Sequence, residues 1–367
     1  MFSPDYRASP TYLMASRLTS AEVYPAEAVR KEKCMQLARF PRARFAHLPT
    51  PLEPMPRLSE ALGVELWVKR DDCTGLAGGG NKTRKLEFLL GEALERGADT
   101  LVTQGAVQSN HVRQTAAAAA RYGLACRVIL EARTGSTAED YVGSGNVLLD
   151  RLLGATIRTV PAGSDMNAAL EEDAEAARQA GAKPYIIPGG GSNTVGALGY
   201  VDCAWELRAQ ADQMDLTIDR LVTATGSAGT HAGLVAGFAL AGADIPILGI
   251  GVRAPKETQE ANVHKLAVAT AEMLGHGERV TRDLTVADCD YVGAGYGLVD
   301  EAVIDALKLA ARTEGLLLDP VYSGKAMKGL IALAKQGHFK GERVVFLHTG
   351  GAQGLFGYHS VLEPSLI

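Results

Sequence analysis

The chain contains 367 residues, of which 47% are hydrophobic and 22% charged, and its formal net charge is −5. This length and apolar content suffice for two domains with buried cores and exclude a disordered protein. The acidic balance and the lack of long runs of like charge argue against a nucleic-acid partner, and no run of about eighteen apolar residues predicts a membrane span. We therefore expect a small polar molecule as the ligand.

Apolar runs alternate with helical patterns along the chain. We expect strands at 66–69, 100–104, 126–131, 156–160, 185–187, 221–225, 247–252 and 344–347. The expected helices lie between them, at 83–96, 109–122, 146–153, 167–180, 196–213 and 229–240. This alternation predicts an α/β protein of two domains, each a mostly parallel twisted sheet covered by helices, and ligands bind at the carboxyl ends of such strands.

The domain boundaries follow from topology, because no linker is visible in the composition. We expect a larger domain of residues 37–95 plus 197–367, a smaller α/β domain of residues 96–196, and an N-terminal extension of unknown role at 1–36. Met35 is an alternative start, and the extension has no secretory signal pattern. The five scattered cysteines lack a Cys-x-x-Cys pair, which predicts a reducing, cytoplasmic location and neither a disulfide framework nor a metal site.

A lysine stands behind a glycine triplet at the start of the first of these helices. Lys82 follows Asn81 and the glycines at 78–80. Because glycine lets the backbone approach a partner closely, this loop could serve a phosphate, which needs backbone N–H groups, or a carbonyl cofactor, which needs the lysine itself. A nucleotide-binding P-loop is disfavoured, because Lys82 comes one residue too late after Gly80.

Two further loops join a strand to a helix. Ser109, Asn110 and His111 open the alanine-rich helix, where one of them would cap the helix and the others could bind a carboxylate. The segment 225–230 contains small residues and hydroxyls that suit a phosphate at a helix amino end. A dinucleotide-binding oxidoreductase is disfavoured by the glycine spacing of this loop, and a catalytically silent binding module by the presence of Lys82.

Five motifs occur in an order that resembles the pyridoxal-phosphate enzymes of the tryptophan-synthase-beta-like fold (fold type II). The branch contains D-cysteine desulfhydrase, L-cysteate sulfo-lyase and 1-aminocyclopropane-1-carboxylate deaminase, and the similarity spans about residues 37 to 358. The motifs are Gly79-Gly80-Asn81-Lys82-Thr83-Arg84-Lys85-Leu86-Glu87, Gln108-Ser109-Asn110-His111-Val112-Arg113-Gln114-Thr115, Gly226-Ser227-Ala228-Gly229-Thr230, Asp319-Pro320-Val321-Tyr322 and His348-Thr349-Gly350-Gly351.

The resemblance implies a role for each matched residue. Lys82 would be the Schiff-base lysine and the base for the α proton, with room for the cofactor provided by the glycine turn. Ser109, Tyr296 and Tyr322 would act beside the substrate, although a lone tyrosine is more often a core residue. The cofactor pyridoxal 5'-phosphate would be held by Asn110, Thr225, Gly226, Ser227, Ala228, Gly229, Thr230 and Thr349. The substrate carboxylate would be bound by Ser109, Asn110 and His111. The resemblance also implies a homodimer.

Two positions bear on the substrate, which is expected to be an amino acid. In the deaminase branch we expect Glu and Leu where this chain has Ser323 and Thr349, so the sequence points to carbon–sulfur cleavage. The segments 73–82 and 188–193 are more similar to L-cysteate sulfo-lyase than to D-cysteine desulfhydrase, which stays an alternative, with the deaminase less favoured. Donors to a sulfonate would come from Thr74, Ser192 and Asn193.

Overall fold

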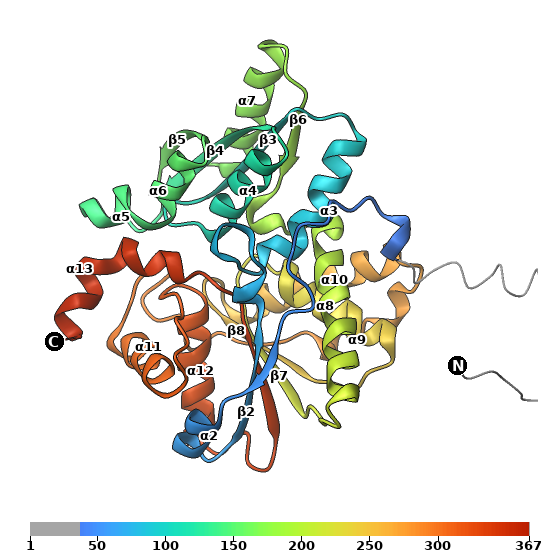
Figure 1. Ribbon diagram of the computed structural model, residues 1–367, viewed down its shortest axis with the longest axis vertical. Helices are drawn as coiled ribbons and strands as arrows, with labels where there is room; N and C mark the ends of the chain where they lie inside the picture. Colours follow the sequence, from blue (N-terminus) through green and yellow to red (C-terminus); the bar gives the residue numbers. More distant parts are fainter. Residues whose placement is uncertain (1–36, 367) are drawn as a thin grey trace, which may run out of the picture.

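The computed structural model describes residues 37–366, which form two β-sheets surrounded by helices (Figure 1). The predicted extension at 1–36, with Met35, lies outside the described residues. All strand pairs are parallel except the pair β1–β2, so the predicted α/β fold with mostly parallel sheets is confirmed.

The larger sheet has six strands in the order β1-β2-β10-β7-β8-β9. Its strands are β1 (Leu52–Pro54), β2 (Glu65–Arg70), β7 (Arg220–Thr225), β8 (Ile247–Gly251), β9 (Val286–Asp288) and β10 (Arg343–His348). The central strands β7 and β10 are buried along nearly their whole length, as expected for apolar runs covered on both faces.

Helices cover both faces of the larger sheet (Figure 1). On one side lie α3 (Lys82–Glu95), α8 (Thr194–Gln213), α9 (Gly229–Ala241) and α10 (Lys256–Met273), which pack on one another. On the other side lie α2 (Pro56–Leu62), α11 (Glu301–Glu314) and α12 (Ser323–Lys335). Among the described residues no helix is long and apolar enough to cross a membrane.

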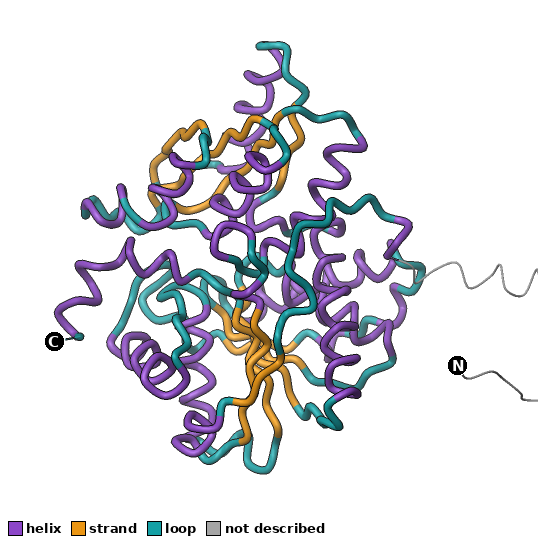
Figure 2. Tube along the Cα trace, in the orientation of Figure 1, coloured by secondary structure: helices purple, strands orange, loops and turns teal. Residues whose placement is uncertain are grey.

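The smaller sheet has four parallel strands in the order β5-β4-β3-β6 (Figure 2). They are β3 (Thr100–Ala106), β4 (Ala125–Ala132), β5 (Thr156–Pro161) and β6 (Pro184–Ile187). Its helices are α4 (Asn110–Arg121), α5 (Glu139–Gly143), α6 (Gly145–Leu152) and α7 (Met166–Gln179). The predicted domain boundaries at 96 and 196 stay a prediction.

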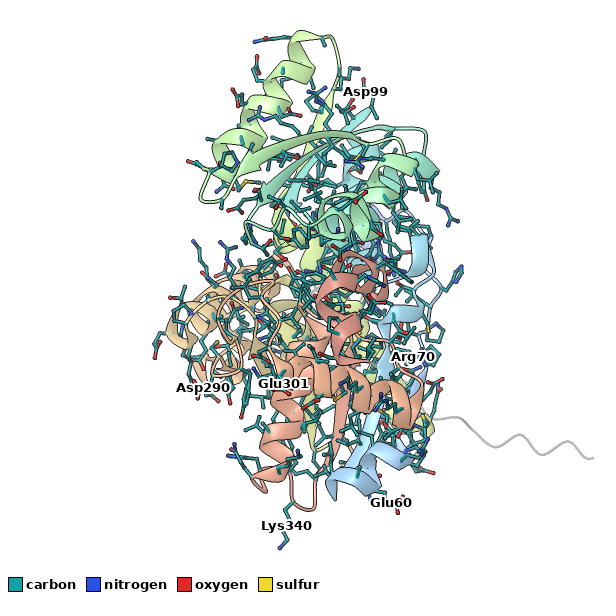
Figure 3. The ribbon with its side chains drawn as sticks, turned by 90° about the vertical axis from the view of Figure 1, so that its left-hand side faces the viewer. Glu60, Arg70, Asp99, Asp290, Glu301 and Lys340 are labelled. Atoms are coloured by element: carbon teal, nitrogen blue, oxygen red, sulfur yellow. The ribbon has the colours of Figure 1, made fainter. Side chains whose placement is uncertain are left out.

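The carboxyl ends of the strands in both sheets point toward the middle of the molecule. In Figure 3, Asp99, just before β3, lies at one end, while Lys340, which precedes β10, and Glu60, which precedes β2, lie at the other. Arg70, the last residue of β2, lies between these two ends. A cavity between the sheets therefore receives the polar loops that follow the strands.

Candidate active site

One cavity of about 540 Å³ lies where the strands of both sheets end. It is lined by Lys82, Gln104, Gly105, Ala106, Ser109, Asn110, His111, Glu131, Arg133, Gly163, Ser164, Asp165, Met166, Asn167, Gly189, Gly190, Gly226, Ser227, Arg253, Tyr296 and Tyr322. An inner recess shares several of these residues and adds Asn81, Ala224, Thr225, Ala228, Thr230, His231 and Thr349. Most residues predicted for the site therefore lie around one continuous space.

Lys82 is a buried amine in the inner recess. Its Nζ donates a hydrogen bond to Oδ1 of Asn81 at 2.8 Å and lies 5.7 Å from the ring centre of Tyr322. Burial lowers the pKa of Lys82 to about 8, with Asp319 raising it and Arg113 lowering it further. Since a neutral amine is a base and a nucleophile, this lysine is suited to both kinds of chemistry.

The glycine triplet before Lys82 does not provide open space for a ligand. All three glycines have positive φ values, and a Cβ on Gly79 would lie 1.8 Å from the carbonyl oxygen of Asp72. A Cβ on Gly80 would lie 2.6 Å from Nε2 of Gln114. The expectation that this turn gives a cofactor room is therefore wrong: the glycines let the loop pack against the protein itself.

The loop at 226–230 turns sharply into α9. Ala228 has φ of +68°, a left-handed conformation that is uncommon for a residue with a Cβ. Among the described residues no acceptor takes the backbone N–H groups of Ser227 and Ala228, and they lie at the positive end of a 13-residue helix. Asn81 ties this loop to the lysine, because its Nδ2 donates to Oγ1 of Thr230 at 2.9 Å. The arrangement is suited to an anion.

A second buried amine beside this loop was not predicted from the sequence. Lys85 lies one turn after Lys82 on α3, and its Nζ is 3.1 Å from the carbonyl oxygen of Gly190. A Cβ on Gly229 would lie 2.7 Å from Nζ of Lys85, so the amine abuts the start of α9. Burial, with a contribution from Lys82, lowers the pKa of Lys85 well below its usual value. An anion bound at this position would favour the protonated, positively charged form of the Lys85 amine.

Two tyrosines meet beside Lys82. The hydroxyl oxygens of Tyr296 and Tyr322 are 2.8 Å apart, and their rings form an edge-to-face contact with centres 5.7 Å apart. Burial raises the pKa of both hydroxyls. They therefore stay protonated at neutral pH. One hydroxyl donates to the other, so one proton of the pair remains to donate a hydrogen bond into the cavity.

Asp319 and Ser323 position Tyr322 and do not themselves line the cavity. The carboxylate of Asp319 accepts hydrogen bonds from the backbone N–H groups of Tyr322 and Ser323, the latter at 2.7 Å. The Ser323 hydroxyl donates to the same carboxylate, at 2.7 Å. These hydrogen bonds close a turn that fixes the start of α12. The role of Ser323 is therefore to hold this turn and not to line the cavity.

Ser109 and Asn110 both reach the cavity, and each also has a structural role. Ser109 is the N-cap of α4, and its Oγ accepts the backbone N–H of Val112 at 3.2 Å. Oδ1 of Asn110 accepts a hydrogen bond from Nδ2 of Asn146 at 2.9 Å. The Ser109 hydroxyl proton and the Asn110 amide can still serve a ligand.

The ring of His111 forms a hydrogen bond inside the protein, although the residue lines the cavity, and its predicted part in binding a carboxylate stays a prediction. The hydroxyl of Thr103 donates to the carbonyl of Ile187 at 2.9 Å, so its oxygen accepts from Nε2–H of His111 at 2.8 Å. Burial lowers the pKa of His111 well below its usual value, which keeps the ring neutral. With its Nε2–H bound to Thr103, the neutral ring has no second N–H to donate to a carboxylate.

The three residues expected to bind a sulfonate do not line the cavity. Thr74 is buried, and its Oγ1 bonds to the backbone and side chains of the lysine loop, including Thr83 at 3.0 Å. Asn193 is the N-cap of α8 and faces another groove. Ser192 lies behind the 226–230 loop, where its Oγ contacts that of Ser227 at 2.8 Å. For these three residues, closeness in the sequence to a polar loop did not predict a place in the lining of the cavity.

Sequence reasoning also missed the polar wall opposite Lys82. Glu131 lies near the end of β4, Arg133 follows that strand and Arg253 follows β8, so the rule that ligands bind at carboxyl ends of strands would have found them. Within residues 37–366 no group of three or more His, Cys, Asp or Glu side chains could hold a metal ion.

Comparisons with known proteins agree with this geometry. The family described as "Pyridoxal-phosphate dependent enzyme" matches residues 43–350. A solved structure described as an ACC deaminase homologue is 39% identical, with a TM-score of 0.82, and the match covers 90% of this chain and 98% of that one.

Two others share the fold. Threonine deaminase isoform 2 from Solanum lycopersicum is 18% identical, with a TM-score of 0.62 and coverage of 87% of this chain and 83% of that one. Diaminopropionate ammonia lyase from Escherichia coli is 15% identical, with a TM-score of 0.64 and coverage of 87% and 88%.

Proposed function

The chain belongs to the family of pyridoxal-phosphate dependent enzymes, and we propose that within it this protein is a carbon–sulfur lyase that converts L-cysteate to pyruvate, sulfite and ammonium. The observation that carries the proposal is the buried amine of Lys82, which has a lowered pKa and shares an inner recess with neutral residues only. The family fixes the cofactor, and the substrate is our inference.

The residues of the inner recess fit pyridoxal phosphate. The free N–H groups of the 226–230 loop, the amino end of α9 and the buried amine of Lys85 suit its phosphate. Lys82 is the amine that would hold its aldehyde, and Asn110 and Thr349 line the space for its ring. When bound, the cofactor supplies a carbonyl for the substrate amine and a sink for the electrons released at the α carbon.

The residues of the chain supply the proton transfers and the orientation. Nζ of Lys82, once free, takes the α proton of the substrate as the general base. Ser109 and the start of α4 would hold the substrate carboxylate. The bond from the β carbon to sulfur then breaks, its electron pair leaves with sulfur as sulfite, and water converts the remaining three-carbon fragment to pyruvate and ammonium. The paired hydroxyls of Tyr296 and Tyr322 can donate their one remaining proton in a hydrogen bond to the departing group.

Thr349 supports elimination of a good leaving group. A carboxylate beside the ring nitrogen would keep that nitrogen protonated and deepen the electron sink, whereas a hydroxyl leaves it shallower. The inner recess has Thr349 and no acidic residue among its described lining. A shallow sink suffices when sulfite leaves, but it suits the opening of a cyclopropane ring poorly, although a homologue of ACC deaminase is 39% identical.

D-cysteine stays the alternative substrate, and a product assay separates the candidates. The purified enzyme is offered L-cysteate, D-cysteine, L-cysteine and 1-aminocyclopropane-1-carboxylate, and sulfite, sulfide, pyruvate and 2-oxobutyrate are measured. We expect sulfite and pyruvate in equal amounts from L-cysteate. Sulfide from D-cysteine as the faster reaction, or 2-oxobutyrate from the cyclopropane, would overturn the proposal. The expected homodimer stays a prediction.

The lowered pKa of Lys82 predicts how the apoenzyme captures its cofactor. Only the neutral amine attacks a carbonyl, and burial lowers the pKa of this amine from 10.5 to about 8. The rate of capture should therefore rise with pH and reach half its maximum at about pH 8. Stopped-flow absorbance after mixing apoenzyme with pyridoxal phosphate measures this rate. A rate that keeps rising steeply with pH up to about 10.5, as for an exposed lysine, would contradict the assignment.

A further inference from the structure

Two arginines from different sheets line the outer part of the active-site cavity. Arg133 follows β4 of the smaller sheet, and Arg253 follows β8 of the larger one. The Arg133 side chain is 21% exposed, and Arg253 is exposed. Because both line the space that also contains Lys82, a substrate bound at the lysine would extend toward them.

The carboxylates on this wall are already engaged. Glu131 accepts hydrogen bonds from Nε and Nη2 of Arg133 through Oε2, and from the backbone N–H of Gly163 through Oε1 at 3.1 Å. Asp165 caps α7 and accepts two of its backbone N–H groups. Within residues 37–366, Nη1 of Arg133 has no hydrogen-bond partner, and Arg253 forms no ion pair. On this wall Arg253 therefore supplies a guanidinium outside any ion pair, and Arg133, although paired with Glu131, keeps Nη1 as a free donor.

The tyrosine pair connects these charges to the reacting end of the cavity. The guanidinium carbon of Arg133 lies 4.7 Å from the ring centre of Tyr296, whose hydroxyl contacts that of Tyr322. Burial raises the pKa of Tyr322, whereas Arg133 and Arg253 lower it, so both arginines act on the hydroxyl beside Lys82. An anionic group on the β carbon would meet hydroxyl donors first and guanidinium groups next.

We propose that Arg133 and Arg253 form the subsite that recognises an anionic oxyacid group on the β carbon of the substrate, and that this subsite favours a sulfonate. The inference rests on the proposed function and deepens it. A sulfonate has three oxygens that need several donors, and guanidinium groups supply charged ones in a fixed geometry. When the bond from the β carbon to sulfur breaks, the electron pair stays on sulfur, and the two arginines stabilise the sulfite that departs.

Binding of an unreactive analogue tests the subsite without turnover. The compound 3-sulfopropanoate is L-cysteate without its amine, so it cannot react with the cofactor, and propanoate is its control without a sulfonate. Calorimetry on the holoenzyme should give dissociation constants for 3-sulfopropanoate that are about 10- to 100-fold higher in Arg133→Met and in Arg253→Met than in the wild type. Arg133→Lys should bind more tightly than Arg133→Met, because it keeps the charge. Unchanged dissociation constants in both Met variants would overturn the proposal.

A specificity ratio provides the second test. For each variant, kcat/KM is measured with L-cysteate and with β-chloroalanine, whose leaving group, chloride, carries no oxygen. The ratio of the two should fall about 10- to 100-fold in the Met variants, whereas the matched variant Arg158→Met, on the same sheet but outside the cavity, should keep it. An equal loss for both substrates would overturn the subsite. Arginine-dependent binding of 3-sulfopropanoate without sulfite release from L-cysteate would support the subsite and overturn the proposed function.

Discussion

Replacing Lys82 with alanine should abolish the visible absorption of the lysine-bound cofactor and lower turnover of L-cysteate by at least about 100- to 10,000-fold, the range that a general base contributes. Lys82 provides the only amine in the lining of the inner recess among the described residues. Alanine removes both the covalent attachment of the cofactor and the base for the α proton. Absorption spectra and sulfite release of the purified variant measure the two effects.

Two control variants separate these effects from a general loss of structure. Lys82→Arg keeps a positive charge but cannot lose its proton near neutral pH, so it should be as inactive as the alanine variant. Lys335→Ala, at an exposed position at the end of α12, should retain both the absorption and the activity. A Lys82→Ala protein with an unchanged visible band would show that another amine holds the cofactor, with Lys85 as the nearest buried candidate.

The sequence predicted the strands β2 to β8 and β10 and the helices α3, α4 and α6 to α9, because their apolar residues form recognisable runs. It missed shorter elements, among them the strands β1 and β9 and the helices α2 and α5. The sequence did not predict α10, whose buried positions include the polar Gln259 and Thr270 beside small residues such as Ala267. These residues give no continuous apolar stripe, and the helix is explained by its packing against α9, α8 and β9. The helices between residues 256 and 335 are therefore known only from the structure.

The site was predictable where a single loop carries the chemistry and less so where loops must meet. Lys82 and the 226–230 loop each have a local signature, and both line the recess. The positions of Arg133 and Arg253 after predicted strands mark them as candidates, but only the way in which the two sheets face each other brings them to one wall. For the same reason, Thr74 and Asn193 seemed suited to a ligand until their hydrogen bonds within the fold were visible.

A second large effect is expected from a residue of the lysine motif that has no contact with the cavity. Arg84 is fully buried on α3, and its Nε and Nη2 each donate to the carboxylate of Asp71 at 2.9 Å. Nη1 and Nη2 donate to Glu206 at 3.0 and 2.8 Å. Burial raises the pKa of Asp71, but Arg84 outweighs it and holds the pKa below its usual value. Arg84 thus joins α3 to α8 and to the turn that follows β2, beneath the lysine loop.

Replacing Arg84 with methionine should lower the free energy of unfolding by about 3–5 kcal/mol, because it leaves two carboxylates buried without their main partner. The exposed pair Arg158–Glu172 is the matched control, and Arg158→Met should cost no more than about 1 kcal/mol.

In the wild type, Asp71 stabilises the fold above its unfolded pKa, and this contribution is lost as the pH falls through the lowered pKa of the folded state. In Arg84→Met the unpaired carboxylate should instead have a raised pKa, so the deficit should shrink on acidification. Denaturant unfolding of both variants at neutral and mildly acidic pH measures this. Equal stability of Arg84→Met and the wild type would mean that Arg84 serves the site and not the fold.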